Sequence, residues 1–145
     1  PGVLVISTAV MMMTFGPSGQ DGTYIGAAYE GVPILPYLAE KLDWLFELLF
    51  GFNHPELISF PITALGAVGA ALSLLPEFGA RGMLDTNTIA VFTAIGMCWS
   101  GYLSTHTAML DSLGYRKLTG KAILAHTIGG LCAGILAHII CLIFF

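Results

Sequence analysis

Long apolar stretches separated by short polar turns dominate this chain. The apolar stretches cover about residues 1–15, 57–76, 88–113 and 122–145. A helix needs about 20 predominantly apolar residues to cross the hydrocarbon core of a bilayer. The last three stretches approach or exceed that length, whereas the first is shorter. The pattern therefore predicts three membrane-spanning helices and the truncated end of a fourth.

A different pattern precedes the second stretch. Residues 16–31 are rich in glycine and polar side chains, which predicts a loop. In residues 34–52 apolar and acidic positions lie on opposite sides of a helix. These are Leu38, Leu42, Leu45 and Leu49 on one side, and Glu40, Asp43 and Glu47 on the other. We predict one amphipathic helix lying at the membrane surface, although its carboxylates leave open the binding of a cation or basic substrate.

Small and polar residues recur at steps of three or four along each predicted span. They are Ser59, Thr63, Gly66, Ala70, Ser73 and Glu77; then Thr93, Gly96, Ser100, Ser104, Thr107 and Asp111; then Ala122, His126, Gly129, Gly130, Ala133 and Ala137. Residues at this spacing share one face of a helix, and small residues let membrane helices approach closely. Gly130 and Gly134 also form a G-x-x-x-G pair. The predicted fold class is therefore all-α, a polytopic transmembrane helix bundle with small-residue helix contacts.

Composition agrees with a membrane protein. Hydrophobic residues make up 56% of the 145 and charged residues 10%, whereas soluble domains carry about 25% charged residues. Mean hydropathy is +0.83. The net charge of −4 and the absence of a basic block exclude nucleic-acid binding. Three cysteines lie within apolar runs and indicate neither a disulfide framework nor a metal site, so we predict no cofactor.

The segments that connect the predicted spans indicate how the protein is oriented in the membrane. Loop 112–121 carries Arg116, Lys117 and Lys121, and the positive-inside rule therefore places it in the cytoplasm. Thr86 or Asn87 can cap the helix that follows residues 77–85. The chain opens on a proline without a charged leader. We expect one transmembrane module over residues 1–145 that is a fragment or half of a larger membrane protein.

Ionisable residues inside the apolar stretches are the candidates for function. His106 and His126 flank loop 112–121 at similar distances, so both can line one polar site for protons, a cation or a hydrogen-bonding solute. The alternative is a pair of neutral histidines bonded to backbone or hydroxyl groups. Asp111 is either functional or a solvated helix end near Arg116. No nucleophile elbow, H-E-x-x-H spacing or phosphate loop is present, and we predict no enzymatic activity.

Three segments carry a resemblance to a known family. They are HPELISFPITALGAVGAALSLLPEF, IGMCWSGYLSTHTAMLDSLG and AHTIGGLCAGILAH, within residues 54–140. They resemble the nucleoside-recognition, or Gate, domain family of bacterial membrane proteins, which includes the spore-maturation membrane proteins. That family is related to the gate regions of B-type ferrous-iron transporters. The shared features are a Pro-x-Thr/Ser-x-x-Gly span, a hydroxyl-rich span and a final span of small residues.

The resemblance implies a helical module in a bacterial inner (plasma) membrane that works with a second half or as a homo-oligomer. It implies a transporter or channel component that moves a small polar solute or ion, such as a nucleoside. The implied path residues are Thr63, Ser100, Ser104, Thr105 and Thr107. To these the residue pattern adds His106, His126 and Asp111. The alternative is a non-transporting structural or assembly subunit whose polar stripes are packing seams.

Overall fold

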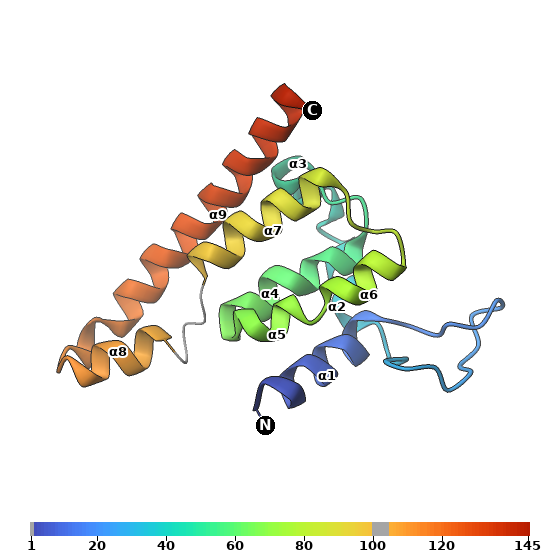
Figure 1. Ribbon diagram of the computed structural model, residues 1–145, viewed down its shortest axis with the longest axis horizontal. Coiled ribbons are helices and arrows are strands. Elements are labelled where there is room, and N and C mark those ends of the chain that lie inside the picture. The colour runs from blue at the N-terminus through green and yellow to red at the C-terminus, as the bar shows by residue number, and fades with distance from the viewer. Residues whose placement is uncertain (1, 100–104) are drawn as a thin grey trace.

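The computed structural model describes residues 2–99 and 105–145, which contain helices and loops and no strand (Figure 1). The helices, in order, are α1 (Gly2–Thr14), α2 (Ile34–Glu40), α3 (Asp43–Phe50), η1 (Pro55–Ile58), α4 (Ser59–Gly66), α5 (Val68–Leu72), α6 (Leu75–Ala80), α7 (Thr86–Cys98), α8 (Thr107–Ser112), η3 (Arg116–Leu118) and α9 (Thr119–Phe144). The predicted all-α class is confirmed for these residues.

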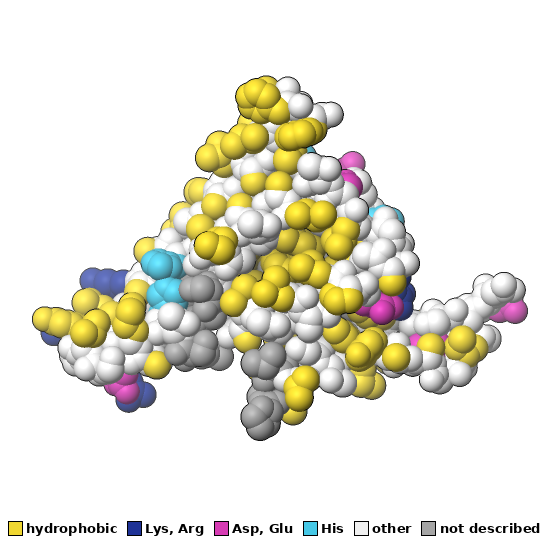
Figure 2. Space-filling model, viewed as in Figure 1, with side chains coloured by type: hydrophobic (Ala, Val, Ile, Leu, Met, Phe, Trp, Pro, Cys, Tyr) yellow, Lys and Arg dark blue, Asp and Glu magenta, His cyan; other side chains and the backbone are white. Residues whose placement is uncertain are grey.

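Helix α9 is the longest element and lies along one side of the molecule (Figure 1). With η3 it forms a segment, Arg116–Phe144, that is long and apolar enough to cross a membrane. Only 22% of its most apolar window is buried within the chain. Leucine, isoleucine and phenylalanine side chains therefore cover its outer surface, as the hydrophobic band along α9 in Figure 2 shows. The predicted span over 122–145 matches α9 closely.

The predicted single helix over residues 57–76 is wrong. This stretch forms η1, α4 and α5 and enters α6, and the chain reverses at Ala67, whose φ of −158° and ψ of 105° are extended. Gly66 and Gly69 flank the reversal, and glycine lowers helix stability because its backbone is freer in the unfolded chain. Helices α4 and α5 therefore form a short hairpin that lies beneath α7 in Figure 1.

The predicted continuous helix over residues 88–113 is also wrong. Helix α7 ends at Cys98, and α8 begins at Thr107 after one π turn at Thr105 and His106. Residues 100–104 lie outside the description. Asp85 caps the start of α7, since its carboxylate accepts the Thr88 N–H at 2.6 Å. The predicted cap at residue 86 or 87 is therefore one or two residues too late.

The amphipathic stretch over residues 34–52 contains two helices. Helices α2 and α3 are separated at Lys41 and Leu42, where Leu42 has a φ of −120° and a ψ of 12°. Gly51 closes α3 in the left-handed conformation, with a φ of 66°. The acidic side chains Glu40 and Glu47 are exposed, in agreement with a solvated polar face.

A cluster of aromatic rings forms the core between α4, α6 and α7. Phe60 and Phe92 stack with ring centroids 4.1 Å apart, and Phe15 meets Phe78 edge to face at 5.6 Å. All four rings are buried. Aromatic contacts of this kind add about 0.5–1.5 kcal/mol each beyond the burial of their area. The short helices are therefore held by tertiary packing more than by their own length.

Residues 15–33 form the predicted loop, which is organised around Glu30. Its carboxylate accepts the backbone N–H groups of Ser18, Ile25, Gly26 and Ala27 at 2.7–3.2 Å. Desolvation raises the pKa of Glu30, but the four N–H donors lower it, and the net pKa lies below its ordinary value of 4.5. The ionised carboxylate thus holds the loop together with backbone hydrogen bonds such as those from Gly19 to Thr23 and from Gly31 to Phe15.

Candidate functional site

Helix α7 packs along α9 through a seam in which glycines face large side chains. Gly130 and Gly134 are buried, and a Cβ atom on Gly134 would lie 2.8 Å from Cγ1 of Ile95. A Cβ on Gly130 would overlap the indole ring of Trp99. The G-x-x-x-G pair is therefore confirmed as a close helix contact.

The face of α9 that meets α7 is rotated from the predicted one. Its buried residues are Gly130, Gly134, His138 and Cys141. Gly129, by contrast, is exposed. His138 lies on this buried face, whereas His126 is exposed and lies about a third of a turn around the helix from His138. The twelve residues between them correspond to about 18 Å of helix, so the two histidines belong to separate sites.

Trp99 fixes the place where α7 ends. Its φ of −95° and ψ of 56° leave the helical region, while its own N–H still bonds to the Ile95 carbonyl at 2.8 Å. The indole Nε1–H lies 3.0 Å from the carbonyl oxygen of His126 and 3.3 Å from that of Thr127. Trp99 is 3% exposed. A buried indole N–H requires an acceptor, and α9 provides it.

His106 and His126 are in direct contact beside this helix end. Nε2 of His106 lies 2.8 Å from Nδ1 of His126, and the two rings meet edge to face with centroids 4.3 Å apart. His106 is 6% exposed, whereas His126 is exposed. The contact therefore joins a buried imidazole just before α8 to an exposed imidazole on α9.

A nitrogen–nitrogen distance of 2.8 Å constrains the protons of the pair. One nitrogen must carry the hydrogen and the other must offer its lone pair, because two facing N–H groups cannot form the bond. A neutral pair satisfies this in either of two tautomeric arrangements. The contact is therefore an imidazole hydrogen bond with room for a single hydrogen.

The second histidine of the seam has a different partner. Asn87 donates from Nδ2 to the Phe50 carbonyl at 2.8 Å, which fixes its Oδ1 as an acceptor. Nδ1 of His138 lies 2.8 Å from that Oδ1 and must therefore carry a hydrogen. Gly51 makes room for this arrangement, since a Cβ there would lie 2.5 Å from Cε1 of His138 and 2.6 Å from Nδ2 of Asn87.

Comparison with protein-family models, curated proteins and solved structures finds no match. What the site can do must therefore follow from its own residues. Within residues 2–99 and 105–145, no group of three histidine, cysteine, aspartate or glutamate side chains is placed to hold a metal ion. The chemistry available in this region is hydrogen bonding and proton exchange.

The predicted path residues fall into several places. His106 and His126 come together. Thr105 is exposed and Thr107 half-buried, on either side of His106. Asp111 is exposed and lies 3.7 Å from Arg116 Nη1, as a solvated helix end does. Ser100 and Ser104 lie outside the described residues.

Thr63 belongs to a separate buried cluster between α1 and α4. Its hydroxyl donates to the Ser59 carbonyl at 2.6 Å, and the Ser59 hydroxyl lies 2.7 Å from that of Thr14. Thr93 and Thr127 likewise donate to the carbonyls of residues four positions earlier. The stripe hydroxyls of Thr63 and Thr93 are thus bonded to their own helices, a common arrangement in apolar surroundings, whereas that of Ser59 bonds to α1.

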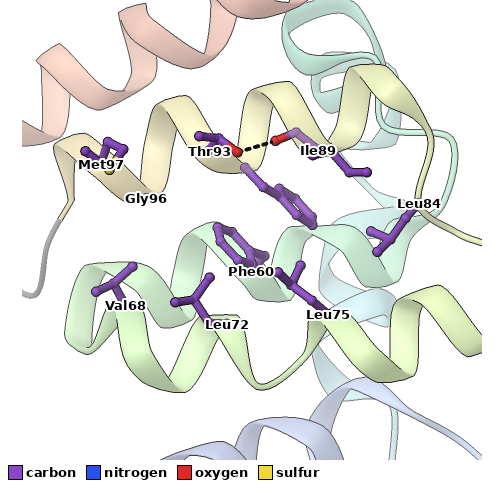
Figure 3. A pocket seen from close by; sticks show the side chains of 10 residues that line it. Phe60, Val68, Leu72, Leu75, Leu84, Ile89, Thr93, Gly96 and Met97 are labelled. Carbon is purple, nitrogen blue, oxygen red and sulfur yellow. Dashed lines mark hydrogen bonds between the residues drawn. The ribbon is translucent and has the colours of Figure 1, made fainter.

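An open apolar groove of about 510 Å³ lies between α7 and the α5–α6 segment (Figure 3). Phe60, Val68, Leu72 and Met97 are among the residues that line it. Thr93 stands at its edge and bonds to the Ile89 carbonyl, as drawn in Figure 3. In Figure 2 the same region shows a hydrophobic floor between α7 and the helices below it. The stripe position Gly96 therefore faces an apolar groove.

Sequence reasoning missed the roles of two residues that organise these contacts, Trp99 and Asn87. The spacing of Trp99, Tyr102 and His106 in the sequence predicts only a shared helical face, yet Trp99 anchors the end of α7. Asn87 was considered only as a cap, although it bonds to Phe50 and orients His138. Gly96 and Gly101 flank Trp99, but single glycines also suit a close helix contact and so do not by themselves predict a helix end. The sequence offers one clue to the pairing of Asn87 with His138: both are polar residues in an apolar protein, and each needs a hydrogen-bond partner when it is buried.

Proposed function

We propose that this chain is a component of a transporter or channel that moves a small polar solute or ion across a membrane. One observation carries the proposal: two breaks in helical backbone lie next to each other. The hairpin reversal at Ala67 is adjacent to the last turn of α7, since a Cβ on Gly96 would lie 3.6 Å from Cγ2 of Val68. Figure 3 shows Val68 and Gly96 facing each other.

Broken helices have a physical use in a membrane. Non-helical backbone is tolerated at membrane depth where it is buried in protein or lines a water-filled cavity, and transporters place such breaks at their binding sites. Helices α4 and α7 both end at this place (Figure 1). Their terminal carbonyl groups carry partial negative charge, which favours a cation or a hydrogen-bond donor.

The exposed surface of α9 supports a membrane location. A long apolar helix whose side chains are mostly exposed requires lipid or another protein to cover it. Three of the five basic residues, Arg116, Lys117 and Lys121, lie in η3 and the start of α9, and Figure 2 shows dark blue patches at this end of the molecule as well as one on the opposite side. This distribution supports a cytoplasmic loop at 112–121. Residues 54–140 also resemble the nucleoside-recognition family of the bacterial inner membrane.

A complete path would require more than this chain provides. Helix α7 has 13 residues, or about 20 Å, which is less than the roughly 30 Å of the hydrocarbon core. The proposal therefore includes a second membrane half or further copies of the chain. Such a partner would complete a polytopic bundle around the paired helix breaks.

The test is a flux measurement on protein reconstituted in liposomes. With native cysteines replaced, Val68→Cys is modified by a thiol reagent at the hairpin turn. Leu142→Cys, on the exposed surface of α9, is the matched control. We expect modification at residue 68 to reduce flux of a nucleoside, a cation or protons severalfold, and modification at 142 to leave it unchanged. Protein that moves none of these would contradict the proposal.

A structural or assembly subunit is the second candidate. It is favoured by the hydroxyls of Thr63, Thr93 and Thr127, which bond to their own helices and need no solute. This alternative expects no flux in the same liposomes. It also expects that disrupting the glycine seam prevents assembly with a partner chain.

A further inference from the structure

We propose that the contact between His106 and His126 is a proton-binding site that opens when it takes up a second proton. The contact joins the segment that enters α8 to α9. The inference deepens the proposed function by naming the proton as a ligand, and it rests on that function only for its role in transport. The contact itself can be measured without any flux.

The protons of the pair can be followed atom by atom. In one neutral tautomer, Nδ1–H of His126 donates to Nε2 of His106 across 2.8 Å. The first added proton binds Nε2 of His126, the ring that is exposed. It leaves the contact in place and converts it into a charge-assisted hydrogen bond. The second proton must bind Nε2 of His106, which is the acceptor, and the hydrogen bond is then lost.

Burial makes the two steps unequal. His106 is 6% exposed, and a buried imidazolium loses most of its hydration. Two charged rings in contact would also repel each other. The singly protonated pair is therefore expected to persist over a range of pH, and interacting sites of this kind titrate in two macroscopic steps.

The neighbouring described elements carry four charged side chains. They are Asp111 on α8, Arg116 and Lys117 on η3, and Lys121 on α9, all exposed. The described salt bridges join Asp111 to Arg116 and Glu77 to Arg81. The Cys98 thiol is the titratable group of α7.

The position of the pair indicates where its protons come from. His126 lies about 10 Å along α9 from Thr119, near the end that carries Arg116, Lys117 and Lys121. The exposed ring of His126 can therefore exchange protons with water on the basic side of the protein. Opening the contact would release α8 from α9 on that same side.

Trp99 provides the readout, because its indole bonds to the His126 carbonyl. In a Trp44→Phe background, Trp99 is the single tryptophan, and Trp44 is an exposed residue. Emission of the purified protein is recorded from about pH 8 to about pH 5, where imidazoles titrate. We expect Trp99 emission to change in two steps as the pH falls. Emission that stays flat over this range would overturn the proposal.

The variants are chosen to keep the shape of each ring contact. His126→Asn places an amide at the Nδ1 position, and His106→Gln places one at the Nε2 position. Each is expected to reduce the two steps to one, and the double variant is expected to remove both. His138→Asn, at the other end of α9, is the matched control and should retain both steps. Two steps that survive in the double variant would overturn the assignment.

Flux measurements then separate this inference from the proposed function. If emission titrates as expected and the liposomes show no flux, the transport proposal fails and the proton site stands. If flux occurs and emission is flat, the proton site fails and transport stands. If both hold, the double variant should bring the ratio of flux at pH 7.5 to flux at pH 5.5 to about one.

Discussion

Two histidines of α9, His126 and His138, have partners of different chemistry, and these partners give them different responses to acid. His126 meets another imidazole, which can itself take up a proton. His138 meets the Oδ1 of Asn87, an amide that stays neutral across the physiological range. A proton added to Nε2 of His138 leaves its Nδ1–H donation intact. The difference teaches that the partner, more than the histidine, decides whether such a contact is a switch.

The surroundings reinforce this difference. Asn87 is itself bonded to the Phe50 carbonyl, so the His138 contact ties α9 to the end of α3 through fixed backbone. The His106 contact ties α9 to the π turn that directly precedes α8. We therefore interpret the His138 end of the seam as a permanent anchor and the His126 end as the adjustable one.

The largest expected effect is at the anchor, where Gly51→Ala should destabilise the fold. A left-handed residue with a Cβ costs about 1–2 kcal/mol, and this Cβ would also displace His138 and Asn87. Gly114→Ala is the control, because it has a φ of 76° and no atom within 4 Å of the added Cβ. We expect Gly51→Ala to lower unfolding free energy by about 1–3 kcal/mol more than the control. If thermal unfolding shows that Gly51→Ala and Gly114→Ala lose the same free energy of unfolding, the contact between His138 and Asn87 is not an anchor of the fold.

The next effect is at the middle of the seam, where Gly130→Ala should push Trp99 off α9. Overpacking of this kind costs about 1–3 kcal/mol. The neighbouring Gly129→Ala is the control, since nothing lies within 4 Å of its added Cβ. Trp99 emission should change only in Gly130→Ala, together with the acid response of the histidine pair. If both variants unfold at the same temperature, the seam does not depend on this glycine.

The smallest effect is in the loop, and it separates a second acid response from that of the histidines. The lowered pKa of Glu30 means that its contribution to loop stability is fully present above about pH 4.5 and is lost as pH falls through the lowered value. Glu30→Gln should increase proteolysis of residues 18–30 at neutral pH. It should leave the Trp99 titration between about pH 8 and pH 5 unchanged. A Trp99 titration altered by this variant would link the loop to the histidine contact.

Part of the candidate site follows from residue spacing. The placement of His106 and His126 at similar distances from a short loop correctly suggested that they could meet. The G-x-x-x-G pair correctly indicated a close contact of α9. The rotation of that face by about one residue was not predictable, because glycine and alanine occur on several sides of α9 and the bulky Trp99 selects among them.

The helix breaks required tertiary information. Residues 88–113 have the composition of one continuous helix and contain no proline, and the glycines that flank position 99, Gly96 and Gly101, equally suit a packing seam. The indole of Trp99 bonds to carbonyls on a helix almost thirty residues away, and that contact outweighs the tendency of α7 to continue. At Ala67 the flanking glycines gave a local signal, but they equally suit a packing seam.

The sequence by itself determined the all-helical class, the long apolar α9, the polar loop at residues 16–31 and the two histidines near a basic turn. These features depend on local periodicity and composition, which each segment carries independently. Tertiary structure alone decided where α7 ends, which face of α9 is buried, and that His138 has an amide partner while His126 has an imidazole. Those features depend on contacts between distant residues, whose free energies exceed the small differences in local helix propensity.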